Sequence, residues 1–143
     1  MDRIETLLKE FTEIAGVSGF EGDVSAALER RLAGVADIER DRLGSCIARL
    51  RGKKERPRVM LAAHMDEIGF MASHFSGPFV KFNTLGGWWY PRMMGLPVMI
   101  RGAKGDVPGV VASKNPYEME EDERKGPFKA KDLYVDVGLF GKK

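Results

Sequence analysis

The chain has 143 residues, of which 43% are hydrophobic and 31% are charged, a composition typical of a globular protein. Its 23 basic residues are interleaved with 21 acidic ones, and the net charge of +2 excludes a broad cationic surface for nucleic acid. The single cysteine excludes an internal disulfide framework, and no apolar run reaches the roughly 20 residues of a membrane-spanning helix.

Helical periodicity characterises the first part of the chain, which starts without the apolar stretch of a signal peptide and is therefore expected in the cytoplasm. Apolar residues recur at steps of three and four over residues 4–15, which predicts a helix that Asp2 and Glu5 cap at its start. Residues 18–21 (Ser-Gly-Phe-Glu) also have capping-box spacing and predict a second helix, which should end at Gly34. Its buried side is expected to carry Val24, Leu28 and Leu32.

Three short β-strands are predicted next. The first two, Val35–Arg40 and Ser45–Leu50, flank a turn-forming sequence. The third, Arg58–Ala63, is nearly all apolar, which is typical of a strand covered on both faces in an α/β sheet. His64 follows this strand directly, at the carboxyl end, where open α/β sheets bind their ligands.

Short β-type runs replace the helical pattern after Gly69, and Gly and Pro residues separate them. This texture is typical of a small all-β barrel or sandwich. The runs are Phe70–Phe75, Phe79–Phe82, Val98–Arg101, Gly109–Ala112 and Leu133–Val137. We therefore predict part of an α/β domain at residues 1–69 and a β domain at residues 70–143, with a long loop or short helix at 115–131.

The sharpest candidate for chemistry is His64-Met65-Asp66. Side chains two residues apart on an extended chain point to the same side. An imidazole can bind a divalent metal through one ring nitrogen while a carboxylate accepts a hydrogen bond from the other. The pair therefore suits either one metal ligand with its orienting carboxylate or two direct ligands. The alternative is an ordinary surface or packing feature.

Three further features have weaker chemical interpretations. Glu67 is a candidate general base, or simply a charged residue at the end of a strand. His74 lies in a β-type run without an acidic neighbour at ligand spacing, and we interpret it as a non-ligand. The aromatic run Trp88–Tyr90 favours a role in the core and at an interface over a platform for stacking a sugar or peptide.

Several motifs together resemble metallopeptidase family 42, the tetrahedral (TET-type) aminopeptidases, some of which carry glucanase or cellulase names. The first is His64-Met-Asp-Glu-Ile-Gly-Phe70. Others agree in order along the chain: Ala15-Gly-Val-Ser-Gly-Phe-Glu21, Leu85-Gly-Gly-Trp88, Val107-Pro-Gly-Val-Val111 and Asp132-Leu-Tyr-Val-Asp-Val-Gly138. The resemblance spans almost the whole chain, and it is far more specific than a His-x-Asp pair alone.

The resemblance implies a cytoplasmic homo-oligomer, commonly a dodecamer built from dimers, that hydrolyses N-terminal residues from peptides. It implies two divalent metal ions, zinc or cobalt, that activate a water molecule. It further implies an α/β, zinc-peptidase-like catalytic domain interrupted by a small all-β barrel used for dimerisation. By the same resemblance, His64 is a metal ligand and Asp66 is the catalytic residue that orients it.

In the family, the bridging aspartate, the catalytic glutamate and the remaining ligands follow the barrel, and this sequence contains no matching residues. We therefore expect the N-terminal portion of a dinuclear-metal aminopeptidase, with an incomplete metal site and no activity as this chain alone. Whether the chain acts as an enzyme stays open, because the alternative is a non-catalytic oligomerisation or interaction module. A third interpretation, glycan binding by Trp88 and Trp89, lacks the carboxylate pair of glycoside hydrolases.

Overall fold

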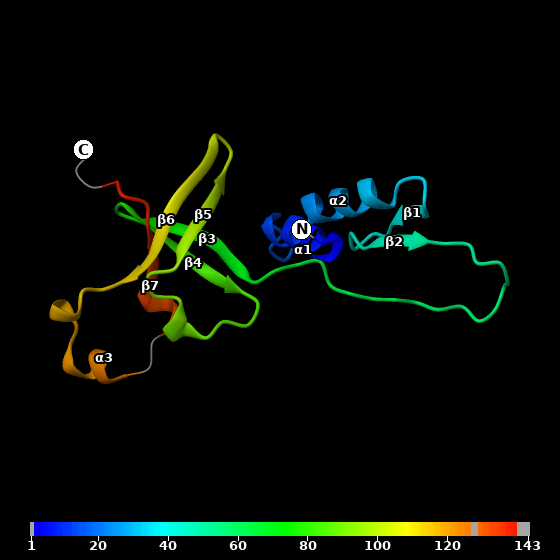
Figure 1. The fold of residues 1–143 in the computed structure, drawn as a ribbon. Helices are drawn as coiled ribbons and strands as arrows, with labels where there is room; N and C mark the ends of the chain where they lie inside the picture. Colours follow the sequence, from blue (N-terminus) through cyan, green and yellow to red (C-terminus); the bar gives the residue numbers. More distant parts are fainter. Residues whose placement is uncertain (1, 127–128, 140–143) are drawn as a thin grey trace. The chain divides into compact units, whose positions relative to one another are not determined.

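The computed structural model describes residues 2–126 and 129–139. The described part does not include residues 1 and 140–143, at the ends of the two predicted domains. It also does not include residues 127–128, which belong to the predicted loop at 115–131. The chain combines helices with β-sheet and divides into two compact units, Met1–Glu67 and Ile68–Lys143 (Figure 1). None of the described helices is long and apolar enough to cross a membrane.

The first unit begins with α1 (Arg3–Glu13), which confirms the first predicted helix. The Glu5 carboxylate accepts a hydrogen bond from the backbone nitrogen of Asp2 at 3.0 Å, so the predicted capping interaction is present. The helix buries no residue completely. Ile4 and Leu8 on its apolar side are 64% and 60% exposed, and the helix therefore presents an incompletely covered apolar face.

The second helix, α2 (Gly22–Leu32), starts later than its predicted capping box. Glu21 occupies the N-cap position without a side-chain capping bond, and Ser18 instead donates to the Asp66 carboxylate. The capping-box prediction at 18–21 is therefore wrong, because a partner distant in sequence takes the Ser18 hydroxyl. Val24 is buried as predicted, together with Ser25 and Ala27, whereas Leu28 and Leu32 are only half-buried.

The predicted hairpin is confirmed as β1 (Asp37–Arg40) and β2 (Cys46–Arg49), which pair antiparallel. Asp41 organises its turn, because its Oδ1 accepts hydrogen bonds from the backbone nitrogens of Ser45 at 2.8 Å and Leu43 at 2.9 Å. These hydrogen bonds hold the pKa of the Asp41 carboxyl below its ordinary value, and those from Ser45 have the largest effect. Ion pairs join the elements of this unit: Glu10–Arg31 between α1 and α2, and Glu29–Arg40 between α2 and β1.

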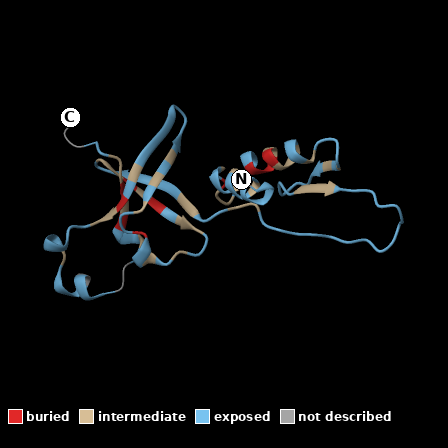
Figure 2. Ribbon diagram, in the orientation of Figure 1, coloured by how far each residue is buried: buried red, intermediate tan, exposed pale blue. Residues whose placement is uncertain are grey.

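The predicted strand Arg58–Ala63 does not form in this structure. These residues belong to an extended, exposed stretch of chain that returns from the hairpin (Figures 1 and 2). Val59, Met60 and Leu61 are 80%, 87% and 94% exposed. The sequence shows the apolar side chains of a buried strand, but none of the described residues of this unit supplies a neighbouring strand or a covering layer.

The second unit is an antiparallel sheet with strand order β3-β4-β7-β6-β5. Its strands are β3 (Gly69–Ser76), β4 (Phe79–Leu85), β5 (Pro97–Gly102), β6 (Gly105–Ser113) and β7 (Leu133–Asp136). They confirm all five predicted β runs. The sheet curls into a half-barrel with β3 and β5 at its edges, so the described strands do not close the predicted barrel (Figure 1).

The hydrophobic core of this unit lies against β4, β6 and β7. Its buried members are Val80, Phe82, Met93, Val111, Leu133 and Val135. Gly109 on β6 allows the closest approach, because a Cβ atom there would lie 2.4 Å from Val135 Cγ1 and 3.0 Å from the Asp136 oxygen. Any larger residue at this position would therefore push β6 and β7 apart.

Short helical turns connect the strands at three places: η1 (Tyr90–Arg92), η2 (Pro116–Glu118) and η3 (Ala130–Asp132). A five-residue helix, α3 (Glu121–Lys125), follows η2. The predicted loop or short helix at 115–131 therefore contains helical turns in its described part.

Candidate functional site

The predicted site residues lie at the end of the first unit, where the chain after α1 meets residues 65–67. The backbone nitrogen of Glu67 donates to the Gly16 oxygen at 2.8 Å, and Val17 and Glu67 form an isolated parallel bridge. Gly16 is required here, because a Cβ atom would lie 2.6 Å from Val24 Cγ2 on α2. The loop after α1 is thereby held against both α2 and the His64–Asp66 segment.

His64 and Asp66 interact directly. The ring nitrogen Nδ1 of His64 lies 2.9 Å from the Asp66 backbone oxygen and 3.1 Å from its carboxylate oxygen Oδ1. Both partners are acceptors, so we assign the proton of the neutral ring to Nδ1, which leaves a lone pair on Nε2. The His64 side chain is 86% exposed, and Nε2 has no hydrogen-bond partner within residues 2–126 and 129–139.

Asp66 is held from two sides. Its Oδ1 faces His64, and its Oδ2 accepts a hydrogen bond from the Ser18 hydroxyl. The Ser18 hydroxyl first, and the His64 ring after it, hold the pKa of the Asp66 carboxyl below its ordinary value, although desolvation opposes them. The carboxylate is therefore ionised at neutral pH and fixed in orientation, which suits a residue that orients an imidazole.

Glu67 and His74 are engaged elsewhere. The Glu67 carboxylate accepts a hydrogen bond from the backbone nitrogen of Gly16 at 3.1 Å, which gives it a structural partner. His74 lies on β3, and its Nδ1 is 3.1 Å from the Ser73 hydroxyl. The described residues contain no group of three or more His, Cys, Asp or Glu side chains that could hold a metal ion.

The donor set therefore fits one ligand position of a divalent metal rather than a complete site. Nε2 of His64 is available, whereas both carboxylate oxygens of Asp66 already have partners. Sequence reasoning found His64 and Asp66 because they lie two residues apart. It missed Ser18, because that residue lies 48 positions before Asp66 and carries no local signal of the contact.

The aromatic run divides between core and surface. Trp88 stacks on Phe70 with ring centroids 4.6 Å apart, and its Nε1 donates to the backbone oxygens of Gly69 and Leu85, each at 3.1 Å. Tyr90 is half-buried against the core, whereas Trp89 is 68% exposed. The predicted core role is thus confirmed for Trp88 and Tyr90, and the interface role of the run stays a prediction.

A sequence model of the family described as M42 glutamyl aminopeptidase matches residues 44–143. FrvX of Escherichia coli (strain K12) is 38% identical over 135 residues, which are 92% of this chain and 37% of FrvX. The structural similarity extends over both units of the chain.

The solved TET aminopeptidase of a marine sediment archaeon (Thaumarchaeota archaeon SCGC AB-539-E09) matches with a TM-score of 0.88 and 40% identity, over 96% of this chain and 39% of that one. The TET1 peptidase of Pyrococcus horikoshii, which can assemble into a tetrahedron or a large octahedral shell, matches with a TM-score of 0.78 and 30% identity, over 96% of this chain and 41% of that one. The chain thus spans about two-fifths of the length of these relatives.

Proposed function

Because the chain belongs to the M42 glutamyl aminopeptidase family, we propose that it supplies part of the metal site of an aminopeptidase that removes N-terminal residues from peptides. One observation carries this proposal. Ser18 holds Asp66, Asp66 holds Nδ1 of His64, and Nε2 of His64 remains available in an 86% exposed side chain.

In this proposal, His64 binds the metal through Nε2, and Asp66 is the carboxylate that fixes the ring and raises its basicity. Ser18 is a positioning residue, because it acts on the imidazole only through Asp66. A bound divalent metal would supply a Lewis acid for the peptide carbonyl and an activated water molecule. Zinc or cobalt, with two ions per complete site, is the choice that the family resemblance supports.

We propose that the 143 residues are inactive by themselves. A structural zinc site generally uses four ligands and a catalytic one three, and the described residues do not bring three metal-binding side chains together. Further ligands and a general base must join His64 before a metal pair and its water can be held.

A zinc titration of the 143-residue chain tests the role of His64. Imidazole NMR signals should report weak binding of a single ion at His64 and no response at His74. The His64→Ala variant should lose this binding, whereas His74→Ala, a matched control on an exposed histidine, should retain it. Binding that survives His64→Ala, or two tight sites in one chain, would contradict the proposal.

Self-association through the second unit is the further part of the proposed function. It is supported by the assembly of the Pyrococcus horikoshii TET1 peptidase into a tetrahedron or octahedral shell. It is also supported by Trp89, which is 68% exposed beside a well-packed core. In the complete protein we propose that this unit is the inserted dimerisation barrel of an α/β catalytic domain. The same exposed tryptophan favours, as second candidate, a non-catalytic assembly module.

A further inference from the structure

The loop between α1 and α2 presents Ser18 to Asp66 from a hydrogen-bonded turn. The backbone nitrogen of Phe20 donates to the Val17 oxygen at 2.8 Å, and Gly19 in this turn has a φ of 88°. A positive φ at the third position of a turn favours glycine. Ser18 therefore occupies the second position of a turn with a defined backbone geometry, and the direction of its hydroxyl depends on where the turn is anchored.

Glu67 anchors the start of this turn through two hydrogen bonds with Gly16. Its backbone nitrogen donates to the Gly16 oxygen at 2.8 Å, and its carboxylate oxygen Oε1 accepts from the Gly16 nitrogen at 3.1 Å. Gly16 is buried, and a buried backbone N–H group needs an acceptor, which the Glu67 carboxylate supplies. The two bonds fix the residues before the turn beside the residue that follows Asp66.

We propose that Glu67 is a positioning residue for the imidazole of His64. Its carboxylate holds Gly16, and the turn that follows places Ser18 against Asp66. Asp66 accepts the Ser18 hydroxyl at Oδ2, while its Oδ1 lies 3.1 Å from Nδ1 of His64. The proposal rests on the proposed function, because the imidazole that Glu67 positions is the proposed metal ligand.

A positioning role and the general-base role that the sequence allows for Glu67 make different chemical demands. A general base must be ionisable, whereas a positioning residue needs only an acceptor oxygen that reaches the Gly16 nitrogen. Glu67→Gln keeps the length and an acceptor oxygen but loses the charge. Glu67→Asp keeps the charge but is one methylene shorter, so its carboxylate falls short of Gly16. The two variants therefore separate reach from charge.

The ring nitrogens of His64 report its positioning directly. Nitrogen NMR spectra of the 143-residue chain, recorded at mildly alkaline pH where imidazoles are neutral, show which ring nitrogen carries the proton. We expect the proton on Nδ1 in the wild type and in Glu67→Gln, and divided between both nitrogens in Glu67→Asp. The amide signals of Ile38 and Ala48, paired in the β1–β2 hairpin, should be the same in all three proteins.

A double variant tests whether Glu67 acts through Ser18. Ser18→Ala alone should release the His64 ring to the same extent as Glu67→Asp, and the two changes together should add nothing further. Additive effects would overturn the inference, because they would assign Glu67 a role independent of Ser18. A ring proton that stays on Nδ1 in Glu67→Asp, or one that Glu67→Gln displaces to the same extent, would also overturn it.

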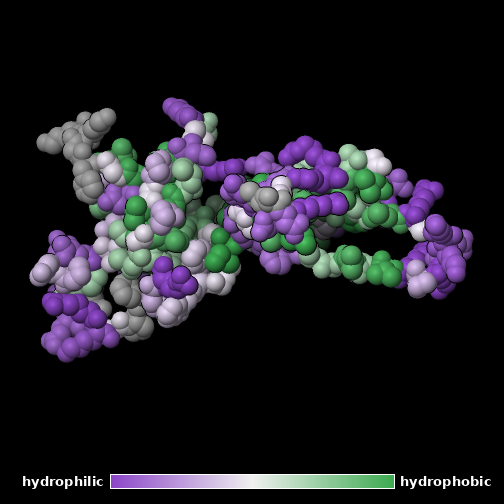
Figure 3. Space-filling view, in the orientation of Figure 1, coloured by the Kyte–Doolittle hydropathy of each residue, from purple (hydrophilic) through white to green (hydrophobic). Residues whose placement is uncertain are grey.

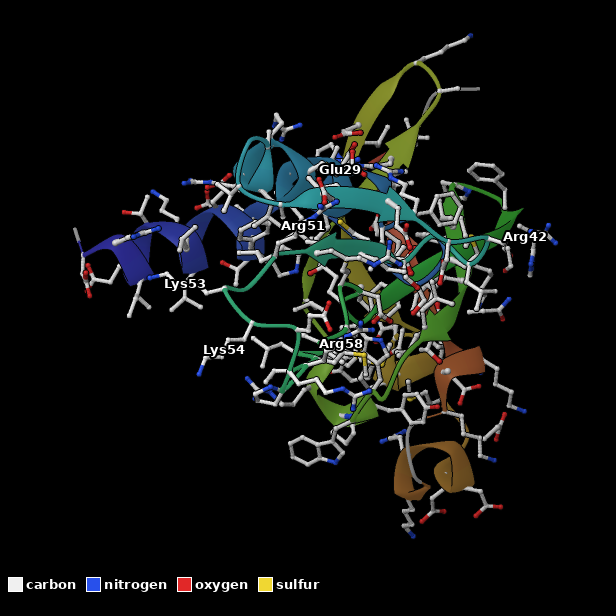
Figure 4. The ribbon with its side chains drawn as sticks, turned by 90° about the vertical axis from the view of Figure 1, so that its right-hand side faces the viewer. Glu29, Arg42, Arg51, Lys53, Lys54 and Arg58 are labelled. Atoms are coloured by element: carbon white, nitrogen blue, oxygen red, sulfur yellow. The ribbon has the colours of Figure 1, made fainter. Side chains whose placement is uncertain are left out.

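Glu55 provides a matched control of the same residue type. It lies exposed in the charged loop at 51–58, where Figure 3 shows hydrophilic atoms over the far end of the extended chain. Figure 4 shows Lys54, its neighbour in sequence, projecting away from the ribbon of this loop. Glu55→Asp should leave the ring proton of His64 on Nδ1. A displacement equal to that of Glu67→Asp would contradict the proposal.

Zinc binding separates this inference from the proposed function. Glu67→Asp should raise the Kd for zinc at His64 about tenfold, the low end of the cost of losing an outer partner of a metal ligand, whereas Glu67→Gln should bind like the wild type. If zinc binds none of these proteins at His64 but Glu67→Asp still displaces the ring proton, the positioning role is supported and the proposed function is wrong. If zinc binds all three equally and the proton stays on Nδ1, the positioning role is wrong and the proposed function stands.

Discussion

The two units of the chain are similar in length but differ in how they bury hydrophobic residues. The second unit packs six buried apolar residues into one core, and the side chain of Met93 in this core is fully inaccessible to solvent. Among the described residues of the first unit, only two apolar side chains are buried, those of Val24 and Ala27. It leaves exposed Ile4, Leu8, Phe20, Val35, Leu43, Leu50, Val59, Met60 and Leu61.

The difference follows from the way each sheet is assembled. In the second unit, two hairpins, β3–β4 and β5–β6, are joined by β7, and every strand finds its partner within the unit. In the described part of the first unit, residues 2–67, the only sheet is the two-stranded β1–β2 hairpin, and such a hairpin is marginal in water without further packing. The contacts within the second unit bury its hydrophobic core, whereas the described contacts of the first unit leave most of its apolar side chains exposed.

The largest expected difference between the units is in the cost of removing a leucine side chain. Leu133 is 1% exposed in the core of the second unit, so Leu133→Ala should lower the free energy of unfolding by about 2–5 kcal/mol. The matched change Leu61→Ala, at 94% exposure, should alter it by less than about 0.5 kcal/mol. Urea unfolding followed by far-ultraviolet circular dichroism, to which both units contribute, measures both changes, and equal effects would remove the contrast between the units.

Substitution of two separate glycines tests how tightly the sheet of the second unit is packed. Gly109→Ala should destabilise this unit by about 1–3 kcal/mol, because the added Cβ would lie 2.4 Å from Val135 Cγ1. Gly87→Ala is the control, since a Cβ there meets no atom within 4 Å. Thermal unfolding of the two variants should differ clearly, and a Gly109→Ala protein as stable as the control would show that β6 and β7 can separate at little cost.

Self-association should depend on the exposed aromatic of the second unit. If Trp89 anchors a dimer, Trp89→Ala should raise the dimer Kd at least about tenfold, or about 1.4 kcal/mol, without unfolding the unit. Sedimentation over a concentration series measures this change. Trp88→Ala is the comparison, because loss of its stacking on Phe70 should reduce stability first. A wild-type protein that remains monomeric at high micromolar concentration would rule out the anchor.

The smallest effect concerns the hairpin of the first unit. The folded-state pKa of Asp41 is lowered, so its contribution to stability is present above the ordinary pKa of 3.8 and is lost as the pH falls through the folded-state value. Amide NMR shifts of Leu43 and Ser45 should therefore change at acidic pH. Asp41→Asn retains an acceptor oxygen that does not titrate, and it should remove this change. Persistence of the transition in Asp41→Asn would assign it to another group.

The sequence predicted best those features that depend on neighbouring residues. The Asp2–Glu5 cap, the β1–β2 hairpin and the strands of the second unit all rest on local spacing or turn residues. The spacing of His64 and Asp66 predicted that the two side chains lie on the same side of the chain, and in the structure they are in contact. Their proposed role in metal binding stays a prediction.

Two predictions failed because they depend on residues far apart in the chain. Ser18 has the spacing of a helix cap, yet its hydroxyl bonds Asp66 across 48 positions. Arg58–Ala63 has the side chains of a buried strand, but composition cannot show whether a neighbouring strand and covering layers are present. Residues 59–63, whose composition predicted a buried strand, are an exposed apolar stretch of the first unit.

Hydrogen exchange of the 143-residue chain, resolved by residue at low micromolar concentration, tests the contrast between the units most directly. We expect slow exchange in β4, β6 and β7, at Val80, Val111 and Val135, because these strands pair around the buried core. Residues 59–63 should exchange at the rate of an unfolded peptide. If residues 59–63 of the monomeric chain were as strongly protected as Val135, the contrast between the two units would be wrong.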